Sequence, residues 1–96
     1  MSGEQDSNPA PHQDMHIGEI RELAKRYSPD ELEECINRQL AEGTNPCDEN
    51  GSTEEIINVL AKAEFVRSRV NKGMSLGEAI RELGRRIRAA QQGGEV

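Results

Sequence analysis

Cysteine and histidine are the residue types in this sequence with the clearest capacity for chemistry. The chain contains His12 and His16, four positions apart, and Cys35 and Cys47, separated by eleven residues. Two cysteines and two histidines are a sufficient ligand set for tetrahedral zinc. However, neither cysteine belongs to a short CxxC unit, and His12 lies in a polar N-terminal segment. We therefore predict no metal and no cofactor, with these four residues as the weak candidates for ligands.

The two cysteines differ in their sequence surroundings. Cys35 falls on the apolar side of a predicted helix and is expected to be a small core residue. Cys47 lies in a polar loop, where an exposed thiol could react, but Asp48 and Glu49 beside it should disfavour the thiolate. Two cysteines are too few for a disulfide scaffold, so a reducing cytoplasm is the expected location.

A stripe of arginines near the C-terminus is the main candidate for binding an anion. Arg81, Arg85 and Arg88 share one side of a predicted helix and could contact the phosphates of RNA or DNA. Glu78 and Glu82 stand at helical spacing from these arginines and can pair with them. No base-stacking aromatic residue accompanies the stripe, and the chain is acidic, with a net charge of −6. Nucleic-acid binding is therefore kept as an alternative function only.

The segment 75–83, SLGEAIREL, resembles the second helix of ribbon–helix–helix DNA-binding proteins. The resemblance covers nine residues. The basic N-terminal strand that such proteins use is missing from this sequence.

Patterns typical of an active site are not found. The chain has no nucleophile elbow, no glycine-rich phosphate loop, no HExxH motif and no carboxylate pair on an apolar background. Its acidic residues fall on positions that should face solvent. We therefore predict that the protein is not an enzyme.

Hydrophobic periodicity predicts an all-α fold, a compact bundle in a single domain over residues 15–91. Four short helices are expected, at about 15–27, 29–42, 53–72 and 76–91. The flanking segments 1–14 and 92–96 are polar and contain proline or glycine, so they are expected to be disordered tails.

Capping signals define most of the expected helix boundaries. Capping boxes are formed by Ser28 with Glu31, Ser52 with Glu55 and Ser75 with Glu78. Gly43 and Gly73 follow helix ends, where a left-handed conformation is common. Asp14 is the candidate cap of the first helix.

The helix at 53–72 should be the central one, because its first three turns are apolar over more than half of their circumference. The buried stripe of this helix is expected to contain Ile56, Val59, Leu60, Ala63, Val66 and Val70. The second helix should bury Leu32, Cys35, Ile36 and Leu40. The last helix should bury Leu76, Ala79, Ile80, Leu83, Ile87 and Ala90, with Gly84 at the edge of this stripe, where another helix could approach closely.

Phe65 does not belong to the buried stripe of the central helix. It projects about 180° from Ile56 at the helical repeat, close to Lys62 and Arg69. One interpretation is an interface anchor rimmed by polar groups. The other is that a second helix of the same chain covers the ring.

Charge is divided unevenly along the chain. Residues 1–66 carry a net charge of −10 and residues 67–96 carry +4. An acidic helix could therefore pack beside a basic one, within the chain or across a homodimer. We predict a small cytoplasmic interaction or accessory protein that acts on a protein partner or on itself and does not span a membrane, because no long apolar run is present. The interface candidates are Phe65, Lys62, Arg69, Arg81, Arg85 and Arg88.

Overall fold

The computed structural model describes residues 16–93, and this part of the chain is all α-helical, as the periodicity predicts. The helices are α2 (Ile17–Arg26), α3 (Pro29–Glu42), α4 (Thr53–Asn71) and α5 (Leu76–Gly93). The first helix begins at Ile17, later than expected, and the proposed cap Asp14 lies outside the described residues. The last helix is longer than expected and continues to Gly93, so positions 92 and 93 are helical rather than part of a tail.

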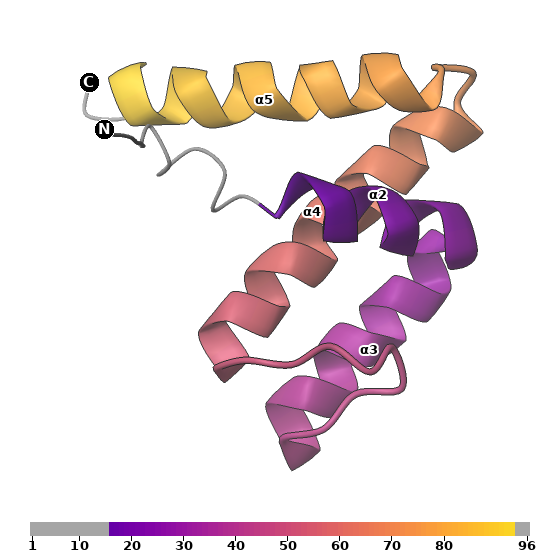
Figure 1. Cartoon of the computed structure of the whole chain (residues 1–96), viewed down its shortest axis with the longest axis vertical. Coiled ribbons are helices and arrows are strands. Elements are labelled where there is room, and N and C mark those ends of the chain that lie inside the picture. The colour runs from indigo at the N-terminus through magenta and orange to yellow at the C-terminus, as the bar shows by residue number, and fades with distance from the viewer. Residues whose placement is uncertain (1–15, 94–96) are drawn as a thin grey trace, which may run out of the picture.

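Helix α4 is the central element. It packs against α2, α3 and α5, and Figure 1 shows it running diagonally through the molecule, with α5 crossing close to its C-terminal end. Helices α3 and α5 lie on different sides of α4. The prediction that this segment is an unbroken helix covered on more than one side is confirmed.

All three predicted capping boxes are formed. In each, the serine hydroxyl accepts a bond of 3.1 Å from the amide three residues on, and the glutamate accepts one from the serine amide. The latter bonds are 2.8 Å at Ser28, 3.1 Å at Ser52 and 3.2 Å at Ser75. Gly43 and Gly73 have φ of 78° and 111°, as expected of residues that end helices. Local sequence therefore sets these boundaries.

The core lies where α4 meets the other three helices. Its buried apolar residues are Ile20, Leu23, Ala24, Leu32, Cys35, Cys47, Ile56, Val59, Leu60, Ala63, Val66, Ala79 and Leu83. Two expectations are wrong: Leu40 is 64% exposed, and Ala90 is exposed near the end of α5. Gln39 is buried in place of Leu40, at 4% exposure. It shares the face of Leu32 because seven residues bring a helix back to nearly the same direction.

Arg67 joins two helices that are distant in sequence. Its Nη1 donates to the carbonyl of Ala24 at 2.9 Å and to that of Tyr27 at 3.4 Å, while Nε donates to Asn71 at 2.9 Å. The carbonyls at the end of a helix have no partner within the helix. A side chain of α4 therefore caps the C-terminus of α2.

Gly84 does not mark a close approach of helices, contrary to the expectation. A Cβ built at this position would meet the guanidinium of Arg88 at 3.5 Å, and no other helix comes near it. The packing therefore does not require glycine at this position.

Within residues 16–93, no helix is both long enough and apolar enough to cross a membrane.

Candidate interaction surface

The two cysteines form a disulfide, which sequence reasoning did not predict. Cys35 on α3 and Cys47 in the following loop have Cα atoms 6.0 Å apart and are joined through their sulfurs. Cys35 is 2% exposed, as a core residue should be. The expectation for Cys47 is wrong: it is 6% exposed and bonded, not an exposed thiol. The chain turns at Gly43 and returns along α3, and this return brings the pair together.

The disulfide also determines which of the candidate metal ligands can bind a metal. Both sulfurs are used in the bond, so neither cysteine can act as a thiolate ligand in this state. His16 is exposed, and its Nδ1 lies 3.0 Å from a carboxylate oxygen of Glu19. His12 lies outside the described residues. Within the described part of the chain, no group of three or more side chains is arranged to hold a metal ion.

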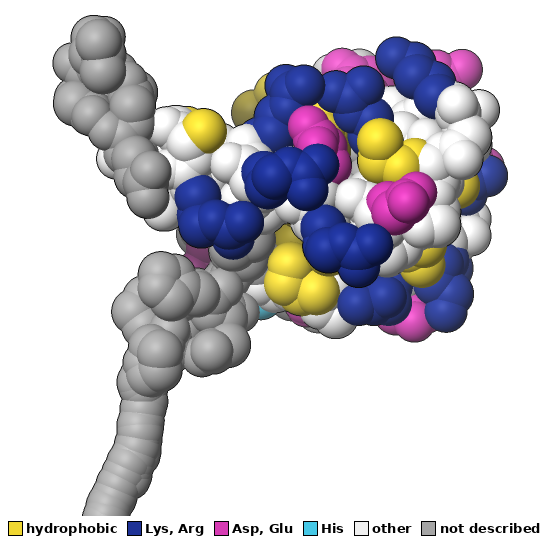
Figure 2. Space-filling view, turned by 90° about the horizontal axis from the view of Figure 1, so that it is seen from above, with side chains coloured by type: hydrophobic (Ala, Val, Ile, Leu, Met, Phe, Trp, Pro, Cys, Tyr) yellow, Lys and Arg dark blue, Asp and Glu magenta, His cyan; other side chains and the backbone are white. Residues whose placement is uncertain are grey.

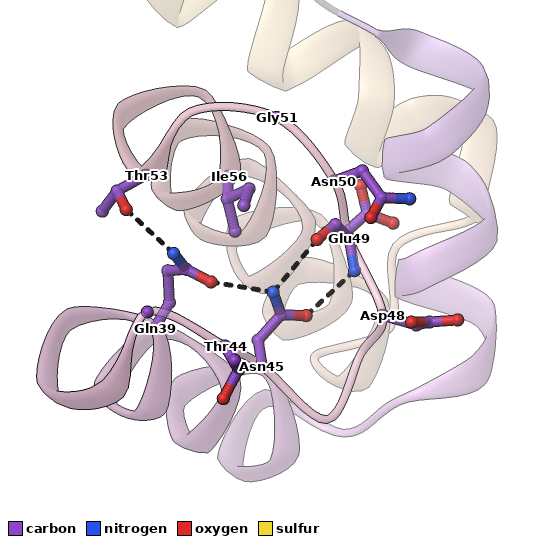
Figure 3. A pocket seen from close by; sticks show the side chains of 10 residues that line it. Gln39, Thr44, Asn45, Asp48, Glu49, Asn50, Gly51, Thr53 and Ile56 are labelled. Carbon is purple, nitrogen blue, oxygen red and sulfur yellow. Dashed lines mark hydrogen bonds between the residues drawn. The ribbon is translucent and has the colours of Figure 1, made fainter.

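A polar hollow of about 330 Å³ lies between the end of α3 and the start of α4 (Figure 3). Its side chains are bonded mainly to one another. The buried amide of Gln39 donates to Thr53 Oγ1 at 2.9 Å and accepts from Asn45 Nδ2 at 3.0 Å. Asn45 also binds both backbone groups of Glu49, at 3.0 and 3.2 Å. Together with the disulfide, these bonds fix the loop over 43–52, and they explain why a glutamine is buried here.

Glu49 is the acidic group that this loop partly buries. Burial raises the pKa of its carboxyl, and the nearby charge of Glu19 adds to the effect, while His16 opposes it. The loop therefore lies close to the start of α2. The side-chain amides of Gln39 and Asn45, which line the hollow, already have hydrogen-bond partners within it. We therefore interpret the hollow as a structural connection between α3 and α4.

The surface around Phe65 is where the predicted interface residues come together. The ring is half-buried, with the guanidinium of Arg69 at 4.8 Å and that of Arg86, on α5, at 5.5 Å from its centre. A side chain of another helix thus covers part of the ring, and the rest stays open, so the interpretation as an interface anchor stays a prediction. Cations at such distances are attracted to the face of an aromatic ring.

A second hollow, of about 380 Å³, adjoins this ring on the outer side of α4. It is lined by Ala61, Glu64, Phe65, Ser68, Arg69 and Lys72. Nε of Arg69 is buried and has no hydrogen-bond partner in the described part of the chain. Sequence reasoning identified Phe65 and Arg69 as interface candidates but did not include Lys72 or Arg86. The spacing of 65, 68, 69 and 72 along one helix was the signal for Lys72.

Of the remaining interface candidates, three lie on α5 and Lys62 lies on α4. Arg81, Arg85 and Arg88 are exposed, while Lys62 is half-buried. Arg85 and Arg86 both pair with Glu82, and their hydrogen bonds lower the pKa of its carboxyl. Arg81 and Arg85 border a separate hollow with Met74 and Glu78. Figure 2, which looks down on α5, shows basic side chains spread over this face with few acidic ones between them.

The side of α4 that faces α3 is acidic. Glu64 lies close to the carboxyl groups of Glu33 and Asp30 on α3. Burial first, and then these two carboxylates, raise the pKa of Glu64 to about 7. Helix α3 itself carries five acidic residues and a single arginine, Arg38, which pairs with Glu34 and Glu42. The acidic and basic helices are therefore separated by α4 and do not pack side by side within the chain.

The comparison with known protein families gives a match over most of the chain. The model of a family of unknown function, DUF6952, matches residues 15–90. The chain belongs to this family. The match includes the disulfide, the Phe65 surface and most of α5. No curated protein and no solved structure matches the chain.

Proposed function

We propose that this member of the DUF6952 family is a small interaction or accessory protein, without catalytic activity, that binds an acidic protein surface. The binding surface is the one formed by α4 and α5 around Phe65. The observation that carries the proposal is the half-open ring held between Arg69 and Arg86. Aromatic and arginine side chains dominate the binding energy of many protein interfaces.

The charges around the ring support an acidic partner. Lys72 lines the same hollow as Phe65, and the exposed arginines of α5 extend the positive region away from it. Complementary charge accelerates association and excludes partners of the wrong sign, whereas a desolvated aromatic anchor supplies affinity. A partner segment with an apolar side chain flanked by Asp or Glu would use both features.

A nuclear magnetic resonance titration with defined peptides tests this function. A peptide of glutamates around one leucine should shift the amide signals of α4 after Phe65 and those of α5, whereas the matching lysine peptide should not. Phe65→Ser should weaken binding of the acidic peptide about tenfold, as expected on loss of an interface anchor. Leu40→Ser removes an exposed apolar residue from a different face and serves as the matched control. Equal responses to both peptides, or none at this surface, would refute the proposal.

Nucleic-acid binding is the second candidate, and the exposed row Arg81, Arg85 and Arg88 is the observation that favours it. Phosphate contacts predict an affinity that falls steeply with salt. A filter-binding titration with random DNA and RNA at two salt concentrations measures this dependence. The partial neutralisation of Arg85 by Glu82 makes this candidate weaker than the first.

The cytoplasm is the proposed location, and the disulfide makes this proposal testable. Disulfides persist mainly in oxidising compartments. A cytoplasmic protein would therefore hold Cys35 and Cys47 mainly as thiols, which restores the alternative of a thiol or zinc protein. Alkylation of free thiols in intact cells before lysis determines the state of the pair, and elemental analysis of the purified protein determines whether zinc is bound.

A further inference from the structure

We infer that the acidic partner is a second copy of this chain, and that two copies pack through the outer faces of their α4 helices, with the two helices parallel. This inference rests on the proposed function and names its partner. The outer face of α4 is defined by Ala61, Phe65 and Ser68, which lie one turn apart and border the hollow of about 380 Å³. This face stays partly open: Ala61 is exposed, whereas Phe65 and Ser68 are half-buried and Arg86 of α5 covers part of the ring.

An acidic shoulder flanks the outer face on the side of α3. It consists of Asp30, Glu33 and Glu64, which repel one another. Among the described residues, none of the three has a cationic partner in an ion pair. A like-charged cluster of this kind lowers the stability of the isolated chain, and a cation brought by another molecule would relieve the repulsion.

A basic shoulder flanks the same face on the side of α5. It consists of Lys62, Arg69 and Arg86. Lys62 and Arg69 share a flank of α4 because they are seven residues apart, and Arg86 reaches the Phe65 ring from α5. Arg69 has no ion-pair partner in the described part of the chain, and its buried Nε has no acceptor. Among the described residues, Lys62 and Arg69 thus lack the carboxylate partner that an acidic shoulder provides, whereas Arg86 already pairs with Glu82. Helix α4 keeps the two shoulders apart within one chain.

Symmetry determines how two copies can satisfy both shoulders. A two-fold axis parallel to α4 places the acidic shoulder of each copy opposite the basic shoulder of the other, in two equivalent contacts. A two-fold axis perpendicular to α4 keeps each shoulder on its own side, so that acid faces acid and base faces base. Charge complementarity therefore selects the parallel arrangement. The two Phe65 rings then lie next to the axis, and the hollow beside Ala61 receives them.

Sedimentation equilibrium of the full chain and its charge variants tests this arrangement. The wild type should form dimers, and Glu33→Lys or Arg69→Glu alone should each raise the dimer dissociation constant about tenfold, because each reverses two contacts at once. An equimolar mixture of the two variants should recover the wild-type value, because the heterodimer restores one native contact and creates one reversed pair. Lys62→Glu replaces Arg69→Glu if circular dichroism shows that loss of Arg69 disturbs the fold.

Matched reversals on α2, which lies on the other side of the molecule, provide the control. Arg21→Glu and Glu22→Lys are exposed and should leave the dissociation constant unchanged. A wild type that stays monomeric at the highest attainable concentration overturns the inference. The parallel arrangement is overturned if the wild-type dissociation constant is recovered when Glu33→Lys is mixed with wild type, rather than with Arg69→Glu. That result requires the acidic shoulders of the two copies to face each other. If the protein stays monomeric but still binds the acidic peptide through Phe65, self-association is refuted and the proposed function stands.

Discussion

Reduction of the disulfide between Cys35 and Cys47 should lower the stability of this protein strongly. The bond joins residues 12 positions apart and so closes a short loop within a small domain. A cross-link around about 13 residues lowers the entropy of the unfolded chain enough to contribute roughly 3 kcal/mol. For a domain of this size, each 1 kcal/mol corresponds to about 4–8 °C in Tm, so the expected loss is about 12–24 °C.

Thermal unfolding followed by circular dichroism, with and without a thiol-free reductant, measures this difference. The double variant Cys35→Ala/Cys47→Ala is the control, because its Tm should not respond to the reductant. The helices should persist after reduction, since α4 packs against its neighbours independently of the bond. Equal Tm values for the oxidised and reduced wild type would refute the reasoning. Alkylation of two thiols in the unfolded, unreduced protein would refute the bond itself.

Five further substitutions test three other features of the fold by the same unfolding measurement. Gly84→Ala should stabilise the protein by about 0.5–1 kcal/mol, because alanine is a better helix former and nothing crowds the new methyl group. Gly43→Ala should destabilise the protein by about 1 kcal/mol, because residue 43 has a positive φ of 78°. Arg67→Ala should cost roughly 1.5 kcal/mol, since the last carbonyls of α2 lose their donor, whereas Arg38→Ala, on an exposed ion pair, should cost less than about 0.5 kcal/mol. Glu64 has its pKa raised from 4.5 to about 7, so the folded state holds a proton that the unfolded state releases, and stability should fall as the pH rises between these values. Glu64→Gln should abolish that fall and stabilise the protein by about 1 kcal/mol above pH 7, after allowance for solvent screening of a half-exposed group. An unchanged pH profile would contradict the assignment of this pH dependence to Glu64.

The sequence by itself determines the helices and most of their ends. Capping boxes such as Ser28 with Glu31 and Ser52 with Glu55 act between residues three positions apart, and the glycine that ends a helix acts within one turn. The apolar circumference of α4 likewise predicts that several neighbours must cover it. Such signals can be read without a structure because each depends on local geometry alone.

The candidate interaction surface could be predicted only in part from the sequence. The direction in which Phe65 projects follows from helical geometry, and so do its neighbours on the same helix. The contribution of Arg86 does not, because it depends on the angle at which α5 crosses α4. The burial of Gln39 was missed for the same reason. Leu40 is the more apolar residue and was expected to be buried, but the segment that covers this end of α3 presents polar groups, which the amide of Gln39 can bind.

Only the tertiary structure decided the contacts between segments that are distant along the chain. The path of the loop after Gly43 brings Cys47 back to Cys35, and the packing of α2 on α4 brings Arg67 to the carbonyl of Ala24, 43 residues away. It also placed α4 between the acidic helix α3 and the basic helix α5, so that these two helices do not pack side by side. The spacing of residues along a helix fixes which of them share a face, but the position of a neighbouring helix depends on the packing of every side chain between them.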